Sequence, residues 1–177
     1  IRQSQQPLVV TGLEGEEAAV EGTGEAETEI PEEGAAPVVM TGGVSVTDIY
    51  NQARIDYTQG RYPLAISGFR EVLDIDPRGD LADNAHYWMG EAYIAQRQHD
   101  RALEEFDTVI RDYPDSNKRP DAYLKKAITL ELMDRRSEAM LMYELVIEQF
   151  PRSPQQRVAR RKLEEIMRTT RPVPEGG

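Results

Sequence analysis

The sequence predicts an all-α fold in which three helical hairpins stack in series, followed by one capping helix and preceded by a disordered segment. The first observation is an internal repeat in which Ala, an aromatic residue, Val and Pro recur every 37 residues without a gap. The copies are Ala65, Phe69, Val72 and Pro77; Ala102, Phe106, Val109 and Pro114; and Ala139, Tyr143, Val146 and Pro151. Such a period indicates supersecondary units that stack and share a core. The second observation is a change of composition near residue 46, where a Gly- and Glu-rich beginning gives way to the repeats.

Residues 1–45 form an acidic Gly/Glu/Pro-rich segment that we expect to be a disordered linker. They hold nine Glu, no Asp and one basic residue, Arg2, so most of the formal net charge of −11 lies here. Too few apolar side chains are present to offset the entropy of ordering the chain. Two alternatives stay open. The first alternative is an acidic recognition tail for a basic partner. The second is a short strand, formed by Val38-Val39-Met40 and Val44, that docks on a neighbour.

Composition excludes several classes of protein. The chain has no Cys, so it holds neither a disulfide nor a Cys-based metal site. No apolar run approaches the ~18 residues of a transmembrane helix, so we expect no membrane insertion. The acidic chain has no basic groove, which argues against a nucleic-acid partner. Because the chain begins at Ile1 rather than Met, we expect a fragment or a processed product with any signal peptide out of view.

The first unit, about residues 46–79, is expected to pair a helix over 48–59 with a second over 62–75. Thr47 or Asp48 provides the N-cap of the first helix. Gly60 ends that helix in the left-handed conformation. Pro63 lies in the first turn of the second helix, where its missing N–H has no cost.

The second and third units, about residues 83–116 and 120–153, repeat this plan. We expect helices over 81–96 and 99–112, with Asp80 as a cap, and then over 118–133 and 136–149. Ser153-Pro154 then begins a capping helix over 154–168. These elements define a domain over residues 46–170, followed by a flexible tail over 171–177.

Small residues mark the point where the two helices of each unit cross. Ala53, Gly90 and Ala127 in the first helices are also 37 residues apart. In each second helix the repeated Ala, aromatic and Val lie on one face, at steps of four and three. One hairpin cannot bury this face alone, so neighbouring units share the core.

Residues that carry catalysis or bind metals are not arranged for either role. His86 and His99 are the only histidines, and they have no metal-ligand spacing. The adjacent pairs Glu104-Glu105 and Glu164-Glu165 point to different helix faces, which makes them poor acid–base pairs. We therefore expect no enzyme activity, no cofactor and no metal site.

The first helices of the units are expected to line a groove that binds a partner peptide or helix. The candidate residues are Tyr50, Arg54 and Tyr57 in unit one; Asn84, Tyr87, Glu91 and Ile94 in unit two; and Asp121, Leu124, Ile128 and Glu131 in unit three. The alternative is that some of these aromatics pack between units. Trp88, the single Trp, has the same two interpretations: core packing or exposure at the groove.

The last helix is basic. Its cations are Arg157, Arg160, Arg161, Lys162 and Arg168. One interpretation is a solvated capping face, and the other is a contact for an acidic partner or for the acidic tail of this chain. The second interpretation follows from the uneven distribution of charge.

These features resemble the tetratricopeptide repeat, which has Gly or Ala in the first helix, Ala and an aromatic in the second, and a closing Pro. The resemblance covers about residues 46–151 and implies a superhelix of three hairpins with a capping helix. The second unit matches best, through Trp88, Met89-Gly90, Tyr93, Ala102, Phe106 and Pro114. Asp56 and Leu130 depart from the pattern where a second aromatic is usual. The period is three residues longer than usual, and we expect the extra residues in the turns at 78–80 and 115–118.

A narrower resemblance lies in the second unit. The stretch Ala82-Asp83-Asn84-Ala85-His86-Tyr87-Trp88-Met89-Gly90-Glu91-Ala92-Tyr93 is similar to the phrase ADNAxYWLGEAYY. Tyr113-Pro114-Asp115-Ser116 and Phe150-Pro151-Arg152-Ser153 resemble the accompanying turns. Together they resemble the C-terminal domain of the Tol-Pal-associated periplasmic family called YbgF or CpoB.

This resemblance implies a periplasmic scaffold of the Gram-negative envelope that coordinates outer-membrane constriction with septal peptidoglycan synthesis during cell division. The implied partners are TolA-like proteins and peptidoglycan synthase components. Trimerisation is implied only through an upstream coiled coil that is absent from this chain. The alternative is an adaptor of another envelope complex, such as an outer-membrane protein assembly lipoprotein or a secretion apparatus.

Overall fold

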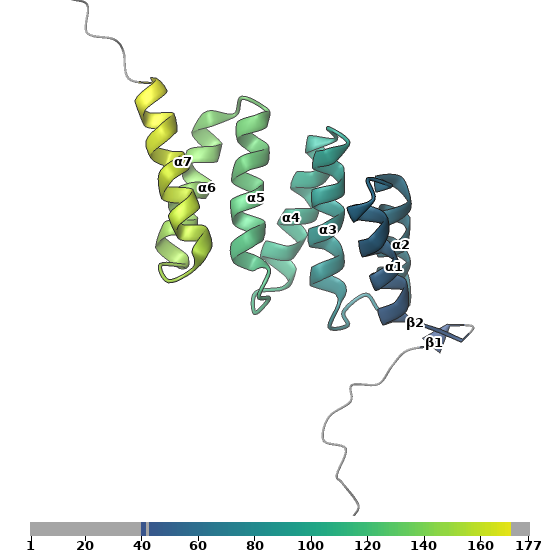
Figure 1. The fold of residues 1–177 in the computed structure, drawn as a ribbon. Coiled ribbons are helices and arrows are strands. Elements are labelled where there is room, and N and C mark those ends of the chain that lie inside the picture. Colours follow the sequence, from purple (N-terminus) through teal and green to yellow (C-terminus); the bar gives the residue numbers. More distant parts are fainter. Residues whose placement is uncertain (1–39, 42, 171–177) are drawn as a thin grey trace, which may run out of the picture. The chain divides into compact units, whose positions relative to one another are not determined.

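The computed structural model describes residues 40–41 and 43–170, and this part of the chain is helical apart from one short hairpin (Figure 1). Strands β1 (Met40–Thr41) and β2 (Val44–Ser45) pair antiparallel, with Met40 opposite Ser45. The helices that follow are α1 (Val46–Thr58), α2 (Tyr62–Ile75), α3 (Ala82–Ala95), α4 (His99–Asp112), α5 (Arg119–Leu132), α6 (Arg136–Gln149) and α7 (Pro154–Thr170). The predicted linker over residues 1–45 lies outside the described residues except at this hairpin, and the predicted tail over 171–177 lies outside them entirely.

The start of α1 differs from the prediction. Ser45, not Thr47 or Asp48, is the N-cap, and its Oγ accepts a hydrogen bond from the Asp48 N–H at 3.1 Å. The Asp48 carboxylate accepts in return from the Ser45 N–H at 3.3 Å. Asp48 is therefore the third residue of a capping box, a reciprocal arrangement that satisfies two backbone donors.

The second helices of the units, α2, α4 and α6, have the predicted bounds. We call them the B-type helices, and α1, α3, α5 and α7 the A-type helices. The predicted cap at Asp80 is wrong, because Leu81 precedes α3 and provides no side-chain hydrogen bond. The cap of α7 is confirmed, since Ser153 Oγ accepts from the Gln156 N–H at 3.2 Å and Pro154 is the first helical residue.

The first helix of every unit ends in the same left-handed turn. Gly60 has φ 74°, as predicted, and residues 37 and 74 positions later, Arg97 and Asp134, have φ 60° and 59°. The next residue closes each turn with a backbone hydrogen bond, from Arg61 to Asp56 at 2.8 Å in unit one and at 2.9 Å in the other two. Two units therefore hold a non-glycine residue where the left-handed conformation favours glycine.

The repeated residues form the core. Ala65, Ala102 and Ala139 are 0% exposed, and so are the aromatic rings of Phe69, Phe106 and Tyr143. Gly90 lies directly under Phe106, because a Cβ on Gly90 would come within 2.6 Å of a Phe106 ring carbon. The small residues at the crossings thus allow the B-type aromatics to lie close to the A-type helices.

Each helix packs on the next one along the chain, so the units join in sequence order (Figure 1). Polar contacts reinforce the joints: Arg70 of α2 donates to the Tyr93 hydroxyl of α3 at 3.1 Å, and Lys126 of α5 pairs with Asp107 of α4. Of the helices that the structure describes, none has the length and apolar composition needed to cross a membrane.

Candidate functional site

The predicted groove residues all lie on three A-type helices that stand in one row. Helix α1 contacts α3, α3 contacts α5, and α5 contacts α7. We call this surface the A-helix row. Eight of the eleven candidate residues are half-buried: Arg54, Tyr57, Asn84, Glu91, Ile94, Asp121, Ile128 and Glu131.

The other three candidates are buried. Tyr50 is 9% exposed, and Tyr87 and Leu124 are each 7% exposed. The Tyr50 ring packs on Phe69 at 5.6 Å between centroids, and the Tyr87 ring packs on Phe106 at 5.9 Å. These side chains belong to the shared core, so they support the A-helix row from beneath, and a partner contact through them stays a prediction.

An aromatic cluster joins α1 to α3. Trp88 is half-buried, and its ring meets Tyr57 at 5.1 Å and Tyr87 at 5.2 Å between centroids. The Arg54 guanidinium carbon lies 3.6 Å from the centre of the Trp88 ring, in a close cation–π contact. Trp88 therefore combines the two roles that the sequence left open, since it packs between units and also forms part of the half-buried surface.

Side chains 34 residues apart link successive A-type helices. Arg54 stacks on Trp88, Glu91 pairs with Lys125 at 2.6 Å, and the Gln155 amide donates to Asp121 at 2.6 Å. The equivalent position on the next A-type helix is 37 residues later. A partner 34 residues later thus lies three residues before that position, which is nearly one helical turn. Lys125 and Gln155 were absent from the predicted site, and this recurring spacing is the signal that identifies them.

The last junction, from α5 to α7, has a second pair besides Asp121 and Gln155. The Lys162 ammonium on α7 lies 3.2 Å from Glu131, and the Tyr143 hydroxyl of α6 donates to the same carboxylate at 2.8 Å. Glu91, Asp121 and Glu131 are thus all engaged within the protein. Glu91 and Glu131 are each paired with a lysine, whereas the partner of Asp121 is a neutral amide.

Three buried polar atoms in the cluster have no hydrogen-bond partner among the described residues. They are Arg54 Nε, Trp88 Nε1 and Glu91 Oε1. Two are donors and one is an acceptor. A buried polar atom without a partner costs roughly 1–3 kcal/mol, so native proteins rarely leave several in one place. The cluster is therefore the part of the A-helix row best suited to receive polar groups from a ligand.

Burial controls the ionisation of the nearby phenols. Burial, followed by the charges of Glu91 and Asp121, raises the pKa of Tyr87 far above 10. Burial and then Glu91 raise the pKa of Tyr57 in the same way. Both phenols stay neutral at physiological pH, so neither serves as a base. The charges of Arg54, Glu91 and Asp121 all act on the Tyr87 phenol, so these side chains lie near it.

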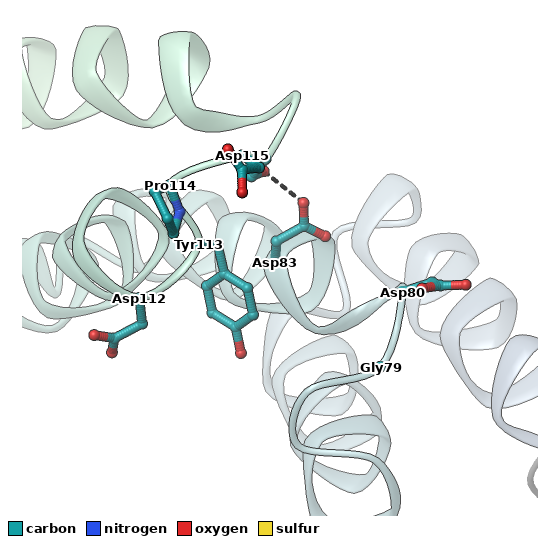
Figure 2. Close-up of a pocket in the computed structure, with 8 residues that line it drawn as sticks. Gly79, Asp80, Asp83, Asp112, Tyr113, Pro114 and Asp115 are labelled. Atoms are coloured by element: carbon teal, nitrogen blue, oxygen red, sulfur yellow. Dashed lines mark hydrogen bonds between the residues drawn. The ribbon is translucent and has the colours of Figure 1, made fainter.

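A separate cavity of about 380 Å³ lies between the turn before α3 and the turn before α5. Figure 2 shows Asp83 directed toward the turn with Pro114 and Asp115, while Asp80 and Asp112 point to opposite sides. Ser116 Oγ donates to Asp83 at 2.5 Å, and the Tyr113 hydroxyl donates to the Pro77 carbonyl at 3.0 Å. No metal-binding group of three His, Asp or Glu occurs in the part of the chain that the structure covers. The contacts in this cavity tie consecutive turns together.

Another cavity, of about 520 Å³, lies on the outer face of α1 and α2 and reaches Val44. The equivalent faces of α3 and α5 pack on the preceding B-type helix. Gln52 and Asp56 line the cavity at the positions that Met89 and Tyr93 occupy in α3. Within the described residues no B-type helix precedes α1, so this face packs on no helix there, and two polar residues stand where α3 has buried Met89 and Tyr93.

Two family models described as tetratricopeptide repeat match the chain, at residues 57–119 and 121–153. Together they cover more than half of the 177 residues. No curated protein matches the chain.

Solved structures with the same fold are similar to most of the chain. The first repeat domain of Spaghetti (RPAP3), bound to the HSP90 peptide SRMEEVD, is 18% identical with a TM-score of 0.58, covering 70% of this chain and 91% of that one. The Sgt2 repeat domain from Aspergillus fumigatus is 21% identical with a TM-score of 0.58, covering 75% and 87%. A chain of the CopN-Scc3 complex is 18% identical with a TM-score of 0.55, covering 82% and 83%.

Proposed function

Because the chain belongs to the tetratricopeptide-repeat family, we propose that it is a non-enzymatic scaffold that binds a segment of a partner protein along the A-helix row. The observation that carries the proposal is the Arg54–Trp88–Glu91 cluster, which combines stacked aromatic surface with three unpartnered polar atoms. A polypeptide offers both kinds of group, since its carbonyls accept hydrogen bonds and its N–H groups donate them.

The hydrogen bonds proposed between the cluster and a bound segment use the two donors, on Arg54 and Trp88, and the acceptor on Glu91. Carbonyl oxygens of the bound segment accept from Arg54 Nε and Trp88 Nε1 when the guanidinium moves off the indole ring. An N–H of the segment donates to Glu91 Oε1, while Glu91 Oε2 keeps its pair with Lys125. The ligand thereby bonds to atoms that have no hydrogen-bond partner among the described residues.

The apolar part of the contact extends along the same row. Tyr57, Ile94 and Ile128 are half-buried on α1, α3 and α5. Side chains at this spacing suit an extended segment or a helix with apolar anchors, which is a common form of peptide recognition. The peptide SRMEEVD bound by the Spaghetti (RPAP3) domain supports a peptide ligand for this fold.

The more specific part of the proposal is a Tol-Pal-associated role in the Gram-negative periplasm, which coordinates outer-membrane constriction with septal peptidoglycan synthesis. Its support is the resemblance of residues 82–93 to the YbgF/CpoB phrase. Trp88 and Glu91, two members of the cluster, lie inside this phrase. The proposed partners are TolA-like proteins and peptidoglycan synthase components.

A pull-down from periplasmic extract with the full chain tests both levels of the proposal. Arg54→Ala and Tyr57→Ala are the suitable variants, because both side chains are half-buried, whereas replacing the buried Tyr50 or Tyr87 would disturb the core. Arg111→Ala is the matched control, since this arginine is exposed on a B-type helix and pairs only with its neighbour Asp112. Circular dichroism checks that all variants keep their helices.

We expect the parent and Arg111→Ala to retain a TolA-like or synthase partner, and the two row variants to lose it. Retention by Arg54→Ala and Tyr57→Ala alike would contradict the A-helix row as the binding surface. If the parent chain instead recovers a partner from another assembly, and Arg54→Ala and Tyr57→Ala lose it, the result would support the scaffold function and contradict the Tol-Pal role.

A further inference from the structure

Helices α1 and α7 lie at opposite ends of the stack (Figure 1). At each later junction a B-type helix packs on the next A-type helix, and Tyr93 of α3 and Lys126 of α5 contact the preceding helix in this way. Their equivalents on α1 are Asp56 and Gln52. No B-type helix precedes α1 among the described residues, so this outer face is open there.

We call the outer face of α1, with the adjoining side of α2, the N-terminal end face, formed by Asp48, Gln52, Ile55, Asp56, Leu64 and Glu71. The cavity of about 520 Å³ in this face is lined by three of its carboxylates and by no Lys, Arg or His. Asp56 pairs with Arg61, whereas Asp48 only makes hydrogen bonds within the cap of α1. Glu71 is exposed and has no ion pair with a described residue. The end face therefore has net negative charge.

Exposed apolar side chains lie on the same end of the stack. Val44 and Leu64 line the cavity and are 48% and 57% exposed. Ile55 is 46% exposed, whereas its equivalent on α3, Ala92, is 0% exposed. The end face thus offers apolar surface together with negative charge.

The opposite end of the stack is cationic. Helix α7 occupies the position of a fourth A-type helix, since Ala159 is 0% exposed like its equivalents Ala85 and Ala122. No B-type helix follows α7 among the described residues, and Arg161 is exposed at the position where Leu124 is buried. We call this open side of α7 the arginine face, formed by Arg157, Arg160, Arg161 and Arg168.

The arginines of this face are unpaired. Of the cations on α7, only Lys162 has an ion pair. None of the four arginines has an ion pair, a hydrogen bond or a ring contact with another described residue. Three other arginines of the described part also lack such contacts, but they lie singly in separate turns: Arg78, Arg97 and Arg152. Even with Glu164 among them, the four arginines leave net positive charge at this end.

We propose that the arginine face of one copy docks on the N-terminal end face of a second copy. The two faces have opposite charge, and within one copy they lie at opposite ends of the stack. Guanidinium groups bind carboxylates with paired hydrogen bonds, so Asp48 and Glu71 are suitable acceptors for these arginines. Helix α7 thereby takes the place against α1 that a B-type helix takes at the later junctions.

The helices match in length. Helix α7 has 17 residues, α1 has 13 and α2 has 14, which correspond to about 25 Å, 20 Å and 21 Å. Arg157 and Arg168 are about 16 Å apart along α7, and Asp48 and Asp56 are about 12 Å apart along α1. Met167, which is 48% exposed, adds apolar surface beside Arg168. The arginine face can therefore cover the whole length of the acidic stripe.

The chemistry of the contact determines its strength and its form. Exposed ion pairs contribute only about 0–1 kcal/mol each and are screened by salt, so the association is weak and salt-sensitive. Because the two faces differ, the contact is head-to-tail, and further copies add in a line. Arg54 and Tyr57 of the A-helix row belong to neither face, so a partner can bind there in the assembled form.

Paramagnetic relaxation enhancement between copies of the full chain tests the contact. The chain has no Cys, so Thr58→Cys gives a single nitroxide site at the exposed end of α1, beside the end face. This labelled chain, without ¹⁵N, is mixed with ¹⁵N-labelled parent at about 0.1 M and about 1 M salt, where the screening length falls from about 10 Å to about 3 Å. We expect broadening of α7 amide signals at the lower salt and its loss at the higher.

A matched label shows whether the contact is localised. Leu132→Cys places the nitroxide at the equivalent residue of the third unit, which is 57% exposed. Two helix spacings of ~10 Å separate this site from the end face. We expect this label to broaden α7 signals of the other copy much less than the label at residue 58 does.

Charge reversal tests the pairing of the two faces. The first variant is Arg157→Glu, Arg161→Glu and Arg168→Glu together in the ¹⁵N-labelled chain, and the second is Gln52→Lys with Glu71→Lys in the spin-labelled chain. Each variant is expected to abolish the broadening when it is mixed with the unreversed partner, and the two variants mixed together are expected to restore it. Arg78→Glu, Arg97→Glu and Arg152→Glu together change the net charge as much as the first variant does, and they should leave the broadening unchanged. Circular dichroism checks that all variants keep their helices.

Four results would overturn the proposal. They are an absence of α7 broadening at the lower salt, equal broadening from the two label sites, broadening that persists in either single reversal, and failure of the paired reversals to restore it. Salt-dependent shifts of α7 signals that do not depend on protein concentration would instead assign the arginine face to an occupant within one copy, and would also overturn it. None of these results bears on partner binding through Arg54 and Tyr57, so this proposal and the proposed function succeed or fail separately.

Discussion

Gly90→Ala tests the packing at the centre of the second unit. A Cβ on residue 90 would lie 2.6 Å and 2.7 Å from two ring carbons of Phe106, and 3.1 Å from a third. Carbon atoms in favourable contact are about 3.5–4.0 Å apart, so the ring has to retreat by ~1 Å. Phe106 is 0% exposed and packs on Tyr87, so the ring can retreat only by displacing side chains of a close-packed core.

The expected cost is the difference between two opposing effects. Overpacking a core costs roughly 1–3 kcal/mol. Replacing Gly by Ala inside a helix recovers about 1 kcal/mol through helix propensity. Because two contacts are far shorter than normal, we expect overpacking to exceed propensity, with a net loss of about 1–2 kcal/mol.

Urea unfolding, followed by circular dichroism, measures this loss. With an m value of about 2 kcal/mol per molar urea, the midpoint should fall by ~0.5–1 M. The matched background is Phe106→Leu, which removes the ring that the new methyl group meets. In that background Gly90→Ala should cost far less, giving an interaction free energy of roughly 1 kcal/mol or more. A Gly90→Ala chain as stable as the parent, or the same loss in both backgrounds, would refute the packing argument.

Three further predictions concern the turns, the pH dependence and the helix crossing. Gly60→Ala should lower the melting temperature through a loss of about 1 kcal/mol, because the φ of 74° strains a residue with a Cβ even though no atom lies within 4 Å of that Cβ. Arg97→Gly, at φ 60°, should raise the melting temperature by removing the same strain. A change of the opposite sign in either variant would contradict strain in the left-handed turns. Burial and Glu91 raise the pKa of Tyr87 above the ordinary value of 10. The stability that the neutral Tyr87 phenol gives to the folded state is therefore fully present below pH 10, and it is lost as pH rises toward the raised pKa. Tyr87→Phe should therefore flatten the fall of the urea midpoint above pH 10, and an identical slope would refute this linkage. Ala102→Leu, at a position that is 0% exposed, should cost roughly 1–3 kcal/mol, and an unchanged melting temperature would contradict close packing at the crossing.

The bounds of the B-type helices were predictable because local chemistry determines both ends. Each begins shortly after a left-handed residue, such as Gly60, and stops before a Pro, such as Pro77. The start of α1 was less predictable, since Ser45, Thr47 and Asp48 all suit an N-cap. Only the reciprocal bond between Ser45 and Asp48 selects the first of them.

Helical periodicity predicted which residues of the candidate site share a face, but not what covers them. Tyr50 and Tyr87 lie on the expected helices, and they are buried because the rings of Phe69 and Phe106 reach across the crossing. The pair Glu91–Lys125 was missed for another reason. Its recognition requires the offset between neighbouring A-type helices, which depends on tertiary packing and not on the pattern within one helix.

The links at a spacing of 34 make the order of the units specific. Trp88 and Lys125 occupy equivalent positions, and so do Arg54 and Glu91, yet each junction pairs a different combination. Exchanging the second and third units would bring Arg54 against Lys125, and two cations would then meet where a cation now lies on an indole ring. Although the three units have the same scaffold, their order is therefore not interchangeable. The side chains that join each unit to the next one determine its place in the stack.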